Sequence, residues 1–156
     1  MTTTAQPILQ ASYRATPYLC VKGAAAAIEF YKAGFGAIES MRLAEPSGKI
    51  GHAEIKIGDA PIMLADEYPE MGVVSPQSLG GSPVTIHVYV PDVDALFARA
   101  VAAGATVTHA VADQFYGDRS GSLVDPFGHK WMFATQKENV SPVEMQQRYT
   151  ALSGDK

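Results

Sequence analysis

Hydrophobic and polar residues alternate along the first half of the chain in an order that predicts one strand, one helix and three more strands. A short apolar run at 18–21 predicts the first strand. A helix follows, because apolar residues recur every three or four positions from Ala24 to Phe35. The three further strands are expected at 37–43, 52–57 and 61–65. Residues 66–83 break this pattern and are interpreted as a connector without a core face.

The same order recurs in the second half. Residues 84–90 predict a strand, and Asp92 is placed to cap a helix whose apolar stripe runs to Val101. Three strands follow at 106–110, 119–124 and 130–135. The first two elements of the halves align at a constant spacing, with Val21 matching Val90 and Ile28 matching Phe97. A repeat of this kind sets the architecture. The sequence therefore predicts an α+β fold made of two βαβββ modules.

These patterns divide the chain into five parts. The expected parts are a disordered arm at 1–12, a first module at 13–68, a linker at 69–83, a second module at 84–138, and a C-terminal helix and tail at 139–156. The last helix is predicted from a capping box, in which Ser141 precedes Pro142 and Glu144.

Composition narrows the class of protein. Of 156 residues, 47% are hydrophobic and 18% are charged, which is typical of a globular domain rather than a disordered one. A net charge of -4 argues against a nucleic-acid-binding surface. One cysteine, Cys20, cannot form an intramolecular disulfide. No apolar run is long enough for a membrane span or a secretory signal, so we expect no membrane partner and a cytoplasmic location.

Several segments resemble the vicinal oxygen chelate superfamily, which holds glyoxalase I, ring-cleaving dioxygenases and bleomycin-resistance proteins. The resemblance rests on 17–21, 27–32 and 35–37. Segments 51–59, 63–67, 116–119 and 125–131 are similar to its PhnB-like branch. The resemblance implies paired modules whose strands curl into an open, cup-shaped mixed sheet with helices on the outer face. It also implies a homodimer.

Metal-dependent members of that superfamily supply ligands from four strand positions. The resemblance places these on Thr16, Met63, Thr85 and Met132. Hydroxyl and thioether groups are poor ligands for the divalent ions concerned, so we expect neither a metal nor another cofactor. A relocated metal site built from His52, Glu54 and His87 stays open as an alternative.

Strand alternation supplies the candidate binding residues. His52 and Glu54 lie two apart and share a face, and their alternative role is a half-exposed polar strand face. His87 and Tyr89 alternate with apolar residues and are expected to face the cup, although a histidine in a sheet is often a core group. The remaining candidates are Tyr18, Met132 and Arg119. The alternative role for Arg119 is an ion pair with Asp118 that fixes the loop. His129 follows a hairpin glycine and is expected to be exposed, and neither it nor His109, at the end of a strand, is expected to have a functional role.

These observations predict a small-molecule-binding protein of the glyoxalase/bleomycin-resistance type. It would bind or sequester a small metabolite or antibiotic without a metal. The alternative is a lyase or isomerase of the glyoxalase type that uses a relocated metal or a general base from His52, Glu54 or His87. The residues leave open the identity of the ligand and whether any reaction is catalysed.

Overall fold

The computed structural model describes residues 14–154, so the arm predicted at 1–12 lies outside the described part. The first module contains β1 (Tyr18–Val21), α1 (Ala24–Phe35), β2 (Ile38–Ala44), β3 (Ile50–Ile57) and β4 (Ala60–Asp66). The second contains β5 (Thr85–Tyr89), α3 (Val93–Ala103), β6 (Thr106–Asp113), β7 (Asp118–Val124) and β8 (Lys130–Gln136). The chain ends in α4 (Pro142–Ser153).

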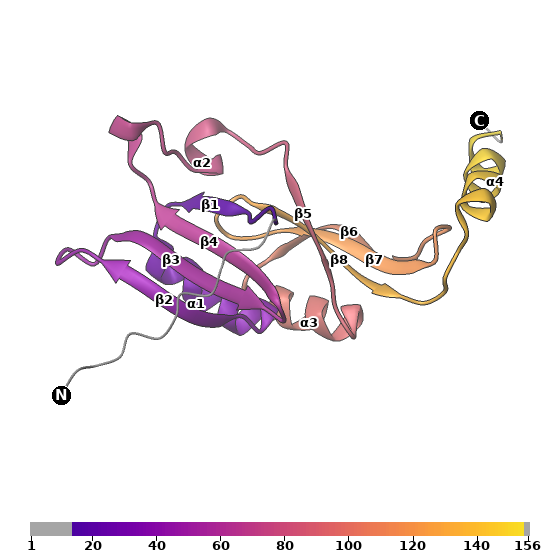
Figure 1. Cartoon of the computed structure of the whole chain (residues 1–156), viewed down its shortest axis with the longest axis horizontal. Helices are drawn as coiled ribbons and strands as arrows, with labels where there is room; N and C mark the ends of the chain where they lie inside the picture. The colour runs from indigo at the N-terminus through magenta and orange to yellow at the C-terminus, as the bar shows by residue number, and fades with distance from the viewer. Residues whose placement is uncertain (1–13, 155–156) are drawn as a thin grey trace.

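Both modules form a four-stranded mixed sheet with the same strand order. The first sheet is ordered β1-β4-β3-β2, and the second is ordered β5-β8-β7-β6. In each, the first strand runs parallel to the last, and the other neighbours are antiparallel. The predicted α+β fold of two βαβββ modules is therefore confirmed. The sheets lie side by side but are not hydrogen-bonded to each other (Figure 1).

The two modules share one hydrophobic core. Each helix covers one face of its own sheet, and α1 also packs against α3. Tyr31 and Phe35 project from α1 onto Trp131 and Phe133 of β8, with ring centroids 4.8–5.6 Å apart. Burial of several aromatic rings at one junction is a large favourable contribution to folding. The other face of each sheet is left uncovered by these helices, and we call it the open face.

A buried carboxylate fixes the junction between the modules. Asp125 follows β7 and accepts hydrogen bonds from the Tyr31 hydroxyl at 2.6 Å and from Trp131 Nε1 at 2.9 Å. The same side chain accepts backbone N–H groups of Phe127 and His129, which shapes the turn into β8. One residue therefore joins the first helix to the second sheet.

The connector is more ordered than its sequence suggests. It holds a short 3-10 turn at Pro69–Met71 and the one-turn helix α2 (Pro76–Leu79). Ser75 and Pro76 are buried, so the prediction that this segment has no core face is wrong. Ser75 caps α2, and its backbone N–H binds the Glu67 carboxylate, which a pattern of apolar residues does not reveal.

The last helix stands apart from the rest of the molecule. None of the residues of α4 is buried, and Figure 1 shows it projecting from the end of the second module. Arg148 anchors it to the second module through an ion pair with Glu138 and a hydrogen bond to the Phe115 carbonyl, while Glu144 within the helix holds the same guanidinium. Within residues 14–154, no helix has the length and hydropathy needed to cross a bilayer. The cytoplasmic location stays a prediction.

Candidate functional site

The open face of the first sheet carries a hydrogen-bonded triad. Tyr18 lies on β1, while His52 and Glu54 lie on β3, with β4 between them. The Tyr18 hydroxyl is 2.6 Å from His52 Nδ1, and His52 Nε2 is 3.3 Å from a Glu54 carboxylate oxygen. The triad forms because strand alternation points all three side chains to one face and tyrosine is long enough to cross one intervening strand.

The environment of the triad keeps the phenol protonated. Partial burial, and then the negative charge of Glu54, raise the pKa of Tyr18 above its usual value of 10.0. Burial likewise raises the pKa of the Cys20 thiol, and the carboxylates of Glu67 and Asp66 add to that effect. Cys20 is therefore a thiol rather than an activated thiolate near pH 7.

The open face of the second sheet carries a different polar group. His87 and Tyr89 lie on β5 with their rings in edge-to-face contact at 4.8 Å. The Tyr89 hydroxyl donates to a carboxylate oxygen of the buried Asp118 at 2.8 Å, and this bond is the main cause of a raised Tyr89 pKa. Met132 on β8 lies directly opposite His87 in the strand register.

The two open faces meet at a cleft between the first strands of the modules, which we call the β1–β5 cleft. It has a volume of about 540 Å³. Tyr18 enters it from the first module and His87 from the second. Its walls are formed by residues 15–19, 82, 84–87 and His129. Ligand pockets in proteins typically have volumes of roughly 300–1,000 Å³, with apolar walls and a few polar groups.

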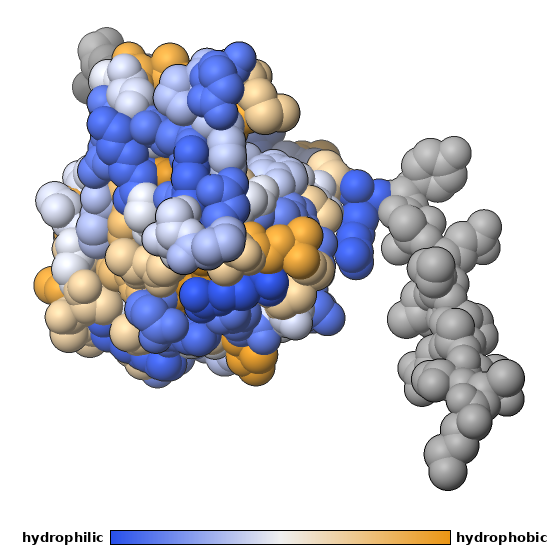
Figure 2. Space-filling model, turned by 90° about the vertical axis from the view of Figure 1, so that its left-hand side faces the viewer, coloured by the Kyte–Doolittle hydropathy of each residue, from blue (hydrophilic) through white to orange (hydrophobic). Residues whose placement is uncertain are grey.

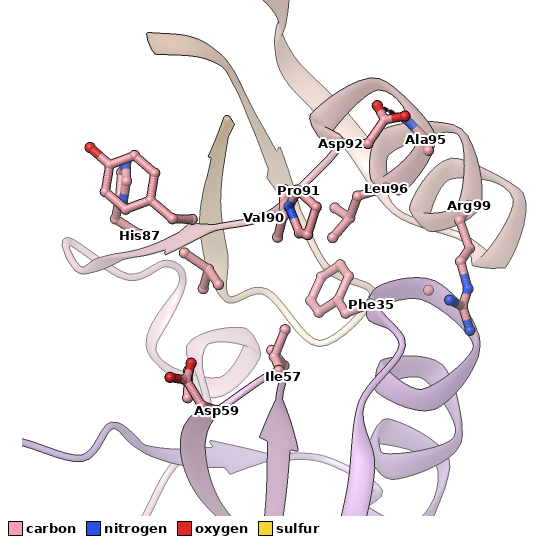
Figure 3. A pocket seen from close by; sticks show the side chains of 15 residues that line it. Phe35, Ile57, Asp59, His87, Val90, Pro91, Asp92, Ala95, Leu96 and Arg99 are labelled. Carbon is pink, nitrogen blue, oxygen red and sulfur yellow. Dashed lines mark hydrogen bonds between the residues drawn. The ribbon is translucent and has the colours of Figure 1, made fainter. Parts of the chain in front are cut away.

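A second cleft lies on the other side of β5, beside the turn between β3 and β4, and we call it the hairpin cleft. It has a volume of about 520 Å³. Figure 3 shows Phe35, Ile57 and Leu96 pointing into the space between the modules, with Asp59 and Arg99 at its edges. The Arg99 guanidinium is already used, because it donates to the Ala33 and Lys32 carbonyls at the end of α1. His87 lines both clefts.

The structure places Arg119 away from the predicted cup. Its neighbours Asp118 and Ser120 point to the open face of β7, and Arg119 points to the opposite face, toward α3. There it forms ion pairs with Asp94 and Asp113 rather than with Asp118. The prediction that Arg119 lines the ligand pocket is therefore wrong, and its guanidinium ties β7 to α3 and β6.

Other residues lie at the clefts for which the sequence predicts no binding role. His129 was expected to be exposed, but it is half-buried, and its ring Nε2 lies 2.8 Å from the Cys20 carbonyl oxygen. It thereby bridges the modules beside the β1–β5 cleft. Phe35 and Leu96 were assigned only to helix stripes, yet they line the hairpin cleft. Periodicity identifies a buried face, but it does not show where two such faces leave a space between them.

Comparison with known proteins gives the family. The sequence profile of the Glyoxalase/Bleomycin resistance protein/Dioxygenase superfamily matches residues 11–133. The chain belongs to this superfamily. Membership of this superfamily does not by itself define an activity, since proteins of one fold catalyse many different reactions.

Similar proteins extend from bacteria to plants. The uncharacterized protein Rv0887c of Mycobacterium tuberculosis is 47% identical over 134 residues, which cover 84% of this chain and 79% of that protein. The structure of the At5g48480 gene product of Arabidopsis thaliana is 29% identical with a TM-score of 0.64, and the match covers 80% of this chain and 99% of that one. TioX of Micromonospora sp. ML1 has a TM-score of 0.63 at 25% identity, covering 80% and 99%.

The metal positions of the glyoxalase superfamily do not fit a metal here. Thr16 and Thr85, two of the four implied positions, both line the β1–β5 cleft, but they offer neutral hydroxyls. Met63 and Met132 offer thioethers, which are poor ligands for Zn²⁺ or Mg²⁺. Residues 14–154 contain no cluster of three or more histidine, cysteine or acidic side chains with metal-binding geometry. The donor set therefore supports no metal-dependent step.

Proposed function

We propose that this glyoxalase-superfamily protein binds a small organic molecule in the β1–β5 cleft. The observation that supports this proposal is the meeting of Tyr18 and His87, from two different modules, in one cleft of about 540 Å³. Leu19 and Ile86 supply buried or half-buried apolar wall beside these polar groups. Such a mixture suits a small aromatic or amphipathic metabolite or antibiotic.

In this proposal some of the candidate residues contact the ligand and others hold those residues in position. Tyr18 and His87 would contact the ligand directly, and His52 and Glu54 would hold the Tyr18 hydroxyl through the triad. Tyr89 and Met132 would support His87, the first by ring contact and the second as its cross-strand neighbour. The fit to the PhnB-like branch is also part of this proposal, and it is supported by the segment Asp125 to Trp131.

A lyase or isomerase remains the second candidate function. It is favoured by the Tyr18–His52–Glu54 triad, because a hydrogen-bonded histidine and carboxylate are the usual parts of a general base. Conversion of a bound compound to an isomer by the purified protein would favour this candidate, whereas recovery of the compound unchanged would favour binding alone.

A thermal-shift screen of aromatic metabolites and antibiotics tests the binding proposal, because a ligand that binds only the folded state raises the melting temperature. Each stabilising compound is then titrated against His87→Ala and against His109→Ala, a matched control on the outer strand β6 that lines neither of the two clefts. We expect the first change to weaken binding about tenfold, as for loss of one polar contact, and the second to leave it unchanged. Equal binding by both variants would contradict the assignment.

We further propose that the protein is a homodimer. Ile38 and Leu43 lie on the open face of the first sheet and are 70% and 60% exposed. Seen from the end formed by the first module, hydrophobic patches lie among hydrophilic side chains on the surface (Figure 2). A closed two-fold dimer is the commonest way to cover such apolar side chains. Sedimentation at micromolar concentration is expected to give the dimer mass, and a clean monomer would contradict this proposal.

A further inference from the structure

The geometry of the Tyr18–His52–Glu54 triad fixes the direction of its hydrogen bonds. A neutral imidazole has one donor and one acceptor nitrogen. Glu54 is an acceptor when ionised, so His52 Nε2 must carry the proton and donate to it across 3.3 Å. His52 Nδ1 is then an acceptor, and the Tyr18 hydroxyl donates to it across 2.6 Å.

This direction determines what Tyr18 offers to a ligand. Its only proton is engaged with His52, so the phenol oxygen presents lone pairs to the β1–β5 cleft. The side chain is 55% exposed, and a bound molecule can therefore reach that oxygen. The ligand group that contacts Tyr18 must be a hydrogen-bond donor.

We propose that the β1–β5 cleft selects a weak acid bearing a phenolic or enolic O–H, and that the triad takes its proton. The ligand proton passes to Tyr18 Oη while the Tyr18 proton passes to His52 Nδ1. Two O–H bonds break, one O–H and one N–H bond form, and the ligand oxygen keeps the electron pair as an anion. Tyr18 then donates to that anion, and the Glu54 carboxylate stabilises the new imidazolium. This inference rests on the proposed binding site in the same cleft.

The surroundings of the triad favour this ion pair. From β4 the open face receives Met63, the register partner of both Tyr18 and Glu54, and from β2 it receives Met41 and Leu43. Tyr18 is 55% and Leu43 60% exposed in the single chain, so it is a bound molecule covering these apolar side chains that lowers the local dielectric constant and strengthens the attraction between the imidazolium and a carboxylate or phenolate. The titratable groups facing the triad or its cleft are Lys56, Cys20, His87 and His129. None of these four carries a carboxylate, and the charge of Glu54, which raises the pKa of Tyr18, is balanced by the imidazolium once His52 takes the proton.

The test compares 3-nitrophenol with 3-nitroanisole, its methyl ether, which has the same ring but no acidic proton. Both are titrated near pH 7, which lies below the pKa of free 3-nitrophenol and above the usual pKa of histidine, about 6.5, so that the free probe is mostly protonated and an ordinary imidazole is mostly neutral. The wild-type protein is expected to generate the absorbance band of the bound phenolate. It is expected to bind the phenol about tenfold or more tightly than the ether, because a hydrogen bond to a charged group is then gained.

Variants locate the effect. Tyr18→Phe keeps the ring and removes the oxygen, so the phenolate band and the preference for the phenol are expected to disappear while ether binding is retained. Glu54→Gln is expected to weaken the band, because the imidazolium loses its counter-charge. Tyr68→Phe is the matched control, since the Tyr68 hydroxyl donates to Glu45 and its residue lines neither of the two clefts. It is expected to behave as wild type.

The outcomes separate this inference from the binding proposal. If phenol and ether bind equally and no phenolate band forms, the proton transfer is overturned, while binding in the cleft stands. A band that persists in Tyr18→Phe would also overturn the inference. If neither probe binds, both proposals fail for this class of ligand. Circular dichroism of each variant confirms that the fold is retained.

Discussion

The two modules have one strand order but different arrangements of polar side chains on their open faces. Tyr18 and His87 occupy matching places, because each lies opposite a methionine on the neighbouring strand, Met63 or Met132. One strand further along, the first module has Glu54 where the second has Ser122. A carboxylate within reach of a histidine makes a triad in one module only. The repeated fold therefore gives both modules the same strand positions, and the residue at each position determines whether a hydrogen-bonded histidine and carboxylate can form there.

The modules also hold their helices differently. The N-cap of α1 is Gly23, which has no side chain to cap the helix. Asp66 from β4 instead accepts hydrogen bonds from the backbone N–H groups of Gly23 and Ala24. In α3 the local residue Asp92 is the cap, and Thr135 on β8 adds a second acceptor. One helix thus depends on a single distant carboxylate, while the other has two smaller supports.

The largest predicted effect concerns the turns between the last two strands of each module. Asp125→Ala removes the acceptor of the buried Tyr31 hydroxyl and the Trp131 N–H, and each unpaired donor costs about 1–3 kcal/mol. We expect urea unfolding to show a loss of about 4 kcal/mol. Asp59→Ala, in the exposed turn between β3 and β4, is the matched control and should cost about 0.5 kcal/mol or less. Equal losses would show that Asp125 does not join the modules.

Removing the two helix caps sharpens the comparison. Asp66→Ala leaves three backbone N–H groups without their acceptor, those of Gly23, Ala24 and Ile50. We expect a loss of about 3 kcal/mol in the free energy of unfolding. Asp92→Ala should cost about 1 kcal/mol, the usual value for an exposed N-cap. The measurement is chemical denaturation of both variants, and a larger loss for Asp92→Ala would contradict this account.

A third comparison concerns residue size under each helix. Ala53 is buried on β3, whereas the matching residue on β7 is Gly121, because a Cβ there would lie 2.7 Å from Phe97 of α3. Gly121→Ala is expected to cost about 2 kcal/mol by overpacking. Adding Phe97→Leu should make the double variant about 1 kcal/mol more stable than the sum of the single changes. Strict additivity in a denaturation cycle would show that the two residues do not compete for space.

The smallest effect appears at high pH. Burial, and then the charge of Asp125, raise the pKa of Tyr31 well above 10.0. The folded state therefore holds this proton more tightly than the unfolded state, so the stability involved is complete below pH 10 and is lost as the pH rises toward the folded pKa. Above pH 10 the free energy of unfolding should fall by up to about 1.4 kcal/mol per pH unit from this group. Tyr31→Phe should remove that part of the slope, and an unchanged slope would contradict the assignment.

Much of the fold followed from local patterns. Alternation predicted the strands, and it placed Tyr18, His52 and His87 on the open faces because the residues that follow them, Leu19, Ala53 and Val88, are apolar and buried. The prediction for Arg119 was wrong because the apolar side chains of its strand, Leu123 and Val124, are adjacent, so no alternation marks the buried face. The triad itself was not predictable, because it depends on β4 lying between β1 and β3, and that order is a property of the whole sheet.

The central claim is that a small molecule binds where β1 and β5 meet. It is tested most directly by titrating ¹⁵N-labelled protein with the most stabilising compound of the thermal-shift screen and following the backbone amide resonances. The account predicts the largest shifts at the non-proline residues among 15–19, at 84–87 and at His129, which line the β1–β5 cleft. Shifts concentrated instead at Phe35, Ile57 and Leu96, in the hairpin cleft, would contradict it.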